Sequence, residues 1–169
     1  MSEFIRSIIK EVSKLDEVAL MNLKCQIYDC IGDVILLGNG GSNAIASHMA
    51  EDYTKVIGKR SICFSDAPRL TCYANDYGYE NAFVQFLKEF SDKKSLVILI
   101  TSSGNSENIL RCADYCCSEG IEFVALTGFS EKNKLRSEYG GRAKQEFWID
   151  STDYGVVECL HEIILHSVI

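Results

Sequence analysis

The sequence has little of several features that mark whole classes of protein. It contains one proline among 169 residues and no low-complexity tract, which argues against a disordered or repetitive chain. No apolar run approaches the ~20 residues that a membrane-spanning helix needs, and the longest candidates, such as residues 96–100, have the length of a strand. The 17 basic residues are outnumbered by 24 acidic ones, and a net charge of −7 argues against direct nucleic-acid binding.

The N-terminal segment and the cysteines indicate the compartment. The first 17 residues carry scattered acidic groups, which is typical neither of a secretory signal nor of an Arg-rich transit peptide. No CxxC pair is present, so we interpret the cysteines as reduced thiols that act as small apolar residues, with a structural metal or disulfides as the alternatives. We therefore expect a cytoplasmic protein. The eight cysteines are Cys25, Cys30, Cys63, Cys72, Cys112, Cys116, Cys117 and Cys159.

What is present is an alternation of short apolar runs and helical patterns. Apolar runs at residues 34–37, 61–64, 95–101, 121–126 and 146–149 predict five strands, and helical periodicity separates them. Two further helices are expected before the first strand, within residues 2–30. Because strands that alternate with helices form parallel sheets covered on both faces, we predict a three-layer α/β/α sandwich with five parallel strands.

Two polar loops stand where ligands bind in such folds, beyond the carboxyl ends of strands. The first, GNGGS at residues 38–42, follows the first strand, and the second, TSSGNS at residues 101–106, follows the third. Glycines allow close approach of the backbone, and hydroxyls with free helix N-terminal N–H groups suit a phosphate. Each loop alone could be an ordinary turn with a helix cap. Neither loop has the pattern of a dinucleotide or Walker A site.

Histidines and carboxylates on two helices are candidates for chemistry. His48 and Asp52 lie four residues apart and share a helical face, which suits either metal binding or proton transfer, or a plain surface pair. Glu158, His161 and His166 interrupt the apolar C-terminal helix. They are either site residues or satisfied polar groups in a subunit interface. Glu158 and His166 lie about 12 Å apart along one helix, so a single ion that used both would need two subunits.

Four segments, taken together and in order, resemble the sedoheptulose-7-phosphate (phosphoheptose) isomerase family of the SIS domain superfamily. They are GNGGSNAIASHMAED, SDAPRLTCYANDYGYENAF, ITSSGNSENILRCADYCCSEGIEFVALTGF and VVECLHEIILH, and they cover most of residues 30–168. The resemblance implies a five-stranded SIS domain at residues 31–169, preceded by an N-terminal helical segment, residues 1–30, that serves oligomerisation. It also implies a homotetramer with active sites at subunit interfaces.

The resemblance assigns roles to individual residues. The sugar phosphate is expected on Ser42, Thr101, Ser102, Ser103 and Ser106, and the sugar along Asn39, Gly41, Asn75, Asp76 and Glu158. One zinc ion per active site is expected on His48, Asp52, Glu158 and His166, with Asp52 and His166 as the catalytic proton carriers. Two positions depart from the family pattern: Asp52 replaces a Glu, and Glu158 replaces a Gln.

The resemblance implies an aldose–ketose isomerase. We expect it to convert sedoheptulose 7-phosphate to D-glycero-D-manno-heptose 7-phosphate through an enediol(ate), as a precursor of heptose in surface polysaccharide. The alternatives are an isomerase of another ketose phosphate, and a non-catalytic SIS module that binds the replication initiator DnaA or senses a sugar phosphate. Retention of His48, Asp52 and His166 favours catalysis.

Overall fold

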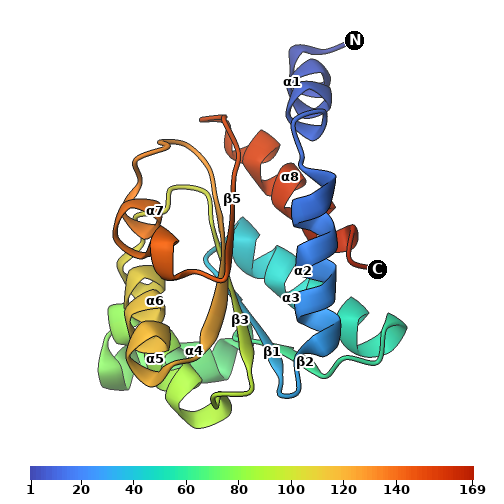
Figure 1. The fold of residues 1–169 in the computed structure, drawn as a ribbon. Helices are drawn as coiled ribbons and strands as arrows, with labels where there is room; N and C mark the ends of the chain where they lie inside the picture. The colour runs from blue at the N-terminus through green and yellow to red at the C-terminus, as the bar shows by residue number, and fades with distance from the viewer.

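The computed structural model describes residues 1–169 as one α/β domain built on a five-stranded, all-parallel sheet (Figure 1). The strands are β1 (Val34–Gly38), β2 (Ser61–Cys63), β3 (Leu96–Thr101), β4 (Glu122–Thr127) and β5 (Gln145–Trp148), in the spatial order β2-β1-β3-β4-β5. β1 and β3 are buried along their whole length, as expected for strands that are covered on both faces. The predicted three-layer fold is confirmed.

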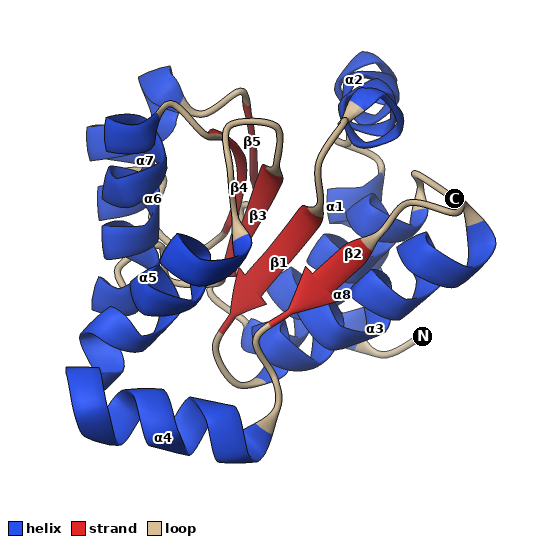
Figure 2. Ribbon diagram, turned by 90° about the horizontal axis from the view of Figure 1, so that it is seen from below, coloured by secondary structure: helices blue, strands red, loops and turns tan.

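Helices cover both faces of the sheet (Figure 2). One layer holds α2 (Glu17–Asp29), α3 (Gly41–Val56) and α8 (Tyr154–His166), and the other holds α4 (Ala67–Tyr77), α5 (Tyr79–Phe90), α6 (Glu107–Glu119) and α7 (Lys134–Tyr139). Two separate hydrophobic cores result, one on each side of the sheet. Successive side chains of each strand point to opposite faces and pack in both cores: Leu36 lies in one core and Leu37 in the other.

The first helix, α1 (Glu3–Val12), extends beyond the sandwich and packs against α8 (Figure 1). Its cap is regular, because the Ser2 hydroxyl accepts a hydrogen bond from the backbone N–H of Ile5. Its apolar side is only partly covered, since Phe4, Ile5 and Ile9 are each at least two-fifths exposed. None of the helices combines the length and the hydropathy that crossing a membrane requires.

The elements match the predicted ones closely, with one exception in length. The segment after β2 was expected to form only a short helix at the Asp66-Ala-Pro-Arg motif, but α4 continues for 11 residues to Tyr77. Asp66 caps this helix through a hydrogen bond from the backbone N–H of Arg69, and Pro68 stands in its first turn. All eight cysteines are free thiols, and Cys112 and Cys116 are buried in the core.

Candidate active site

The strand order places both polar loops at one point of the sheet. The chain runs from β1 outward to β2 and then returns to the other side of β1 with β3, so the order reverses between β1 and β3. Ligands of open parallel sheets bind at such a reversal, beyond the carboxyl ends of the strands. The GNGGS loop after β1 and the TSSGNS loop after β3 flank this position.

The TSSGNS loop presents hydroxyls around a tight turn at Gly104. Thr101 Oγ1 accepts the N–H of Gly104 at 3.2 Å, and Ser103 Oγ accepts the N–H of Asn105 at 3.2 Å. Ser102 Oγ is buried without a partner, and Ser106, at the N-cap of α6, makes no side-chain cap bond. Two hydroxyls and the N-terminus of α6 are therefore free to bind an anion.

Glycines are required in both loops for steric reasons. Gly104 has φ +64°, and a Cβ there would lie 2.1 Å from Asn133 Oδ1. A Cβ on Gly38 would lie 2.7 Å from the Ser42 backbone, because the end of β1 approaches the start of α3 closely. Ser42 is itself buried at this contact. Both loops thus need glycine because other groups approach their backbone closely, as the sequence predicts.

Asn39 is held in one orientation by two neighbours. Its amide exchanges two hydrogen bonds with the buried amide of Asn108 on α6, and its Oδ1 also accepts the hydroxyl of Tyr79 at 2.6 Å. The expected sugar-lining role of Asn39 therefore depends on residues from α5 and α6. The sequence pattern did not single out Asn108 or Tyr79, although Asn108 follows the TSSGNS loop by two residues.

The expected sugar residues at the end of α4 bond chiefly to one another. Asn75 Nδ2 donates to Asp76 Oδ1 at 2.9 Å, and Cys72 Sγ donates to Asp76 Oδ2 at 3.5 Å. Both Asn75 and Asp76 are exposed, and neither contacts the two loops by a hydrogen bond. Their assignment to the sugar stays a prediction.

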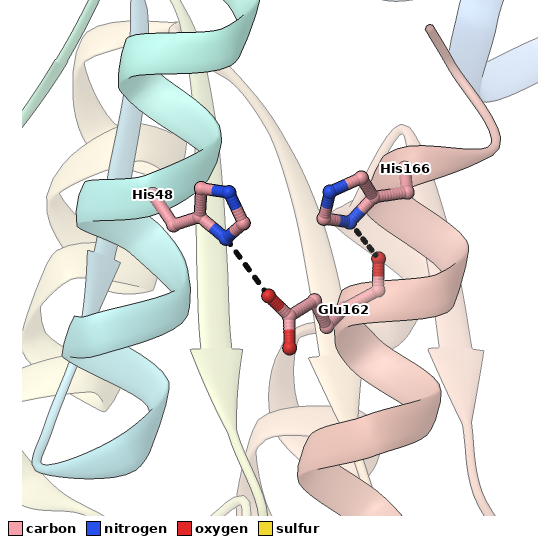
Figure 3. A group of neighbouring side chains, drawn as sticks. All are labelled: His48, Glu162 and His166. Atoms are coloured by element: carbon pink, nitrogen blue, oxygen red, sulfur yellow. Dashed lines mark hydrogen bonds and ion pairs between the residues drawn. The ribbon is translucent and has the colours of Figure 1, made fainter.

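A second group of polar residues lies where α3 and α8 pack side by side (Figure 3). His48 Nδ1 lies 2.9 Å from Glu162 Oε1, and one ligand atom each of His48, Glu162 and His166 lie within 4.8 Å of one another. Asp52 Oδ2 lies 3.4 Å from His48 Nε2 and 3.7 Å from His166 Nε2. This single chain thus brings together His48, Asp52 and His166, three of the four residues that the family resemblance assigns to a metal.

The fourth of those residues, Glu158, lies elsewhere. Its carboxylate packs against the first loop, where a Cβ on Gly41 would lie 2.4 Å from Glu158 Oε1, and it forms no ion pair with either histidine. Glu162, one turn closer to His166, faces His48 instead. Sequence reasoning missed Glu162, although its spacing of four from His166 repeats the spacing of His48 and Asp52.

The helix pair is locked in register next to these residues. The hydroxyl of Tyr53, which is fully buried, donates to the Leu165 carbonyl at 2.9 Å. Burial raises the pKa of this phenol far above its usual value, so it stays neutral and keeps its proton for this bond. Asp52 directly precedes Tyr53 in the sequence, and His166 directly follows Leu165. This buried contact therefore holds the two site residues near each other.

His161, by contrast, is a structural residue. It is fully buried, its Nε2–H donates to the Thr127 carbonyl at 3.1 Å, and its Nδ1 has no partner. Burial lowers its pKa to about 4, so the ring is neutral at physiological pH.

The chain matches a known protein family and several solved structures. The family model described as "SIS domain" matches residues 2–128. The structure resembles phosphoheptose isomerases from Neisseria gonorrhoeae (TM-score 0.87, 22% identity, 98% of this chain and 91% of that chain) and Francisella tularensis (0.87, 24%, 98% and 89%). The chain therefore belongs to the SIS-domain family and has its fold.

Sequence relatives identify the family within the SIS-domain proteins. A phosphoheptose isomerase of Fusobacterium nucleatum is 31% identical over 173 residues, covering 99% of this chain and 87% of the relative. One of Sodalis glossinidius is 37% identical over 142 residues, covering 81% and 70%. The chain belongs to the phosphoheptose isomerase family, as its sequence motifs predict.

Proposed function

We propose that the protein isomerises sedoheptulose 7-phosphate to D-glycero-D-manno-heptose 7-phosphate in the cytoplasm, for the synthesis of heptose-containing surface polysaccharide. The observation that carries the proposal is the convergence of His48, Asp52 and His166 on α3 and α8, where α3 starts in the first of the two phosphate-type loops. Family membership supports the reaction class, because relatives over most of the chain carry the name phosphoheptose isomerase.

The spacing of the two groups supports a seven-carbon substrate. His48 stands seven residues after Gly41 on α3, which corresponds to about 10 Å at 1.5 Å per residue. An extended seven-carbon chain with a terminal phosphate spans about the same length, roughly 10 Å at about 1.2 Å per bond along the chain. A sugar whose phosphate is held by the loops can therefore present its first two carbons to the histidines.

In the proposed reaction the loops bind and the helices move protons. Hydroxyls of Ser42, Thr101, Ser102, Ser103 and Ser106, with the N-termini of α3 and α6, hold the phosphate, and Asn39, Gly41, Asn75, Asp76 and Glu158 line the sugar. Asp52 and His166 remove a proton from the carbon beside the carbonyl and return one to its neighbour, through a cis-enediol(ate). Binding energy from the phosphate positions the reacting carbons without touching them.

We propose zinc as the cofactor, one ion per active site. Two histidines with carboxylates form a plausible zinc set, and His48, Asp52 and His166 would hold the ion from one chain. When bound, the ion would polarise the sugar carbonyl and stabilise the developing oxyanion.

We also propose a homotetramer in which residues 1–30 take part in assembly and residues 31–169 form the SIS domain. The partly uncovered apolar side chains of α1 support this part of the proposal, as do His48 and His166, whose side chains are 49% and 39% exposed in a single chain. A neighbouring subunit over this surface would place the active site at an interface.

The direct test is an NMR assay of isomerisation with sedoheptulose 7-phosphate, with and without a chelator. We expect turnover that the chelator abolishes and added zinc restores. Absence of turnover with the metal-loaded protein would refute the proposed function, and size-exclusion chromatography with light scattering tests the tetramer independently.

A further inference from the structure

Glu162 contacts both histidines of the candidate metal site by two different groups (Figure 3). Its side-chain carboxylate lies 2.9 Å from His48 Nδ1, across the gap between α8 and α3. Its backbone carbonyl lies 3.0 Å from Nδ1 of His166, one turn further along α8. Neither oxygen carries a hydrogen, so in both contacts the histidine Nδ1–H is the donor.

These two hydrogen bonds occupy Nδ1 of each ring. Nε2 is therefore the nitrogen of each ring that is left to bind a metal ion. Both Nε2 atoms face the same oxygen, Asp52 Oδ2, at 3.4 Å for His48 and 3.7 Å for His166. Both Nε2 atoms thus lie near one carboxylate oxygen, which marks the position that a shared cation would take.

Two of the separations between these atoms suit a metal ion. Zinc bonds of 2.0–2.1 Å in tetrahedral geometry place neighbouring ligand atoms about 3.3 Å apart. The two distances to Asp52 Oδ2 lie close to that value. Three protein ligands also leave a fourth position open, as catalytic zinc sites do.

We propose that Glu162 is a positioning residue for this metal site, acting through His48. Its carboxylate holds Nδ1–H of His48 and thereby directs Nε2 toward the position shared with Asp52 and His166. This inference deepens the proposed function and rests on it for the presence of a metal. The competing arrangement, in which Glu162 itself binds the ion, would use the carboxylate oxygen that now accepts the His48 hydrogen bond.

The test is zinc affinity of the full chain, measured by competition with a chromophoric chelator, together with the absorption spectrum of the cobalt(II) form. Loss of an orienting carboxylate beside a metal-bound histidine lowers affinity about 10- to 100-fold, which we expect for Glu162→Ala. Glu162→Gln keeps an oxygen that accepts Nδ1–H, so the loss of zinc affinity should be clearly smaller in this variant. The cobalt(II) bands at saturation should keep the wild-type shape in both variants, because the ligands are unchanged.

Glu51→Ala is the matched control. Glu51 is an exposed carboxylate adjacent to Asp52 on α3 and forms no ion pair with His48, so its removal changes the charge but should leave zinc affinity unchanged. Asp52→Ala should lose more affinity than Glu162→Ala. Circular dichroism of the metal-free variants verifies that each is folded.

Three results would overturn the inference. Equal losses in Glu162→Gln and Glu162→Ala, with altered cobalt(II) bands, would make Glu162 a direct ligand. Wild-type zinc affinity in Glu162→Ala would show that Glu162 has no role in zinc binding. Absence of zinc binding by the wild type would show that there is no metal site. Turnover is scored separately. Isomerisation by a protein that binds no zinc would retain the isomerase function and refute this inference, whereas the expected zinc affinities without turnover would retain this inference and refute the isomerase function.

Discussion

The side-chain amides of Asn39 and Asn108 face each other across 69 residues of sequence and exchange two hydrogen bonds, of 3.0 and 2.8 Å. Asn39 belongs to the loop after β1, and Asn108 belongs to the first turn of α6, after the loop of β3. The pair therefore ties the two ligand loops together across the point where the strand order reverses.

Replacing Asn108 should weaken substrate binding more than it slows the chemical step. In Asn108→Asp the side chain loses its donor to Asn39 Oδ1, and a buried charge stands where the amide was. We expect KM for sedoheptulose 7-phosphate to rise about tenfold, which corresponds to roughly 1.4 kcal/mol, with a smaller change in kcat. Asn22→Asp, an equal charge change at an exposed position of α2, is the control in steady-state kinetics. Unchanged KM in Asn108→Asp would contradict the role of the pair.

His166→Ala should abolish turnover and leave the fold and assembly intact. The side chain is half-buried at the end of α8, so its removal costs little packing, whereas loss of a proton carrier typically costs about 10²- to 10⁴-fold in rate. Activity, circular dichroism and light scattering are the measurements, and Ser167→Ala, at the neighbouring exposed position, should retain activity. Normal turnover in His166→Ala would refute its assignment.

Gly104→Ala should destabilise the protein and weaken phosphate binding. A Cβ at φ +64° is strained by about 1–2 kcal/mol. It would also displace Asn133, whose Oδ1 caps α7 by accepting the Arg136 N–H at 3.1 Å. We expect a loss of about 2–3 kcal/mol in urea unfolding. Gly141→Ala, where a Cβ meets nothing within 4 Å, should change little, and equal stability of both variants would contradict the steric argument.

Stability should fall in mild acid because of His161. Its pKa is about 4 in the folded protein, against about 6.5 for an unfolded histidine, so between these values the unfolded state binds a proton that the folded state does not. This contribution is complete above pH 6.5 and is lost as pH falls toward 4. Between pH 8 and pH 5 the loss amounts to about 2 kcal/mol.

Unfolding in urea at several pH values measures this effect. His161→Gln removes the titrating group, so the difference in unfolding free energy between wild type and variant should itself depend on pH. A constant difference from pH 8 to pH 5 would show that His161 does not govern the acid sensitivity.

The fold was predictable from the sequence because its signals are local. Apolar runs such as residues 96–100 identify buried strands, and glycines that follow them identify the loops. The contacts that orient the site residues were not predictable, because Asn108 and Glu162 act through partners 69 and 114 residues away. In the sequence each is only one polar position on a helix. The family pattern likewise directed attention to Glu158, while the helix register brings Glu162 to His48.

In the proposed function, the rise of α3 between the first loop and His48 would set the length of sugar that the site can process. A hexose phosphate is one carbon shorter than a heptose phosphate, so with its phosphate on the loops its reacting carbons would stop about 1.2 Å short of the histidines. The hydrogen bond from Tyr53 to Leu165 holds α8 in register with α3, so His166 keeps its place beside His48. Selection between sugars would then depend on the rise of a helix and not on the wall of a pocket. Insertion of a single turn into α3 would shift the preferred length of the sugar by about four bond lengths.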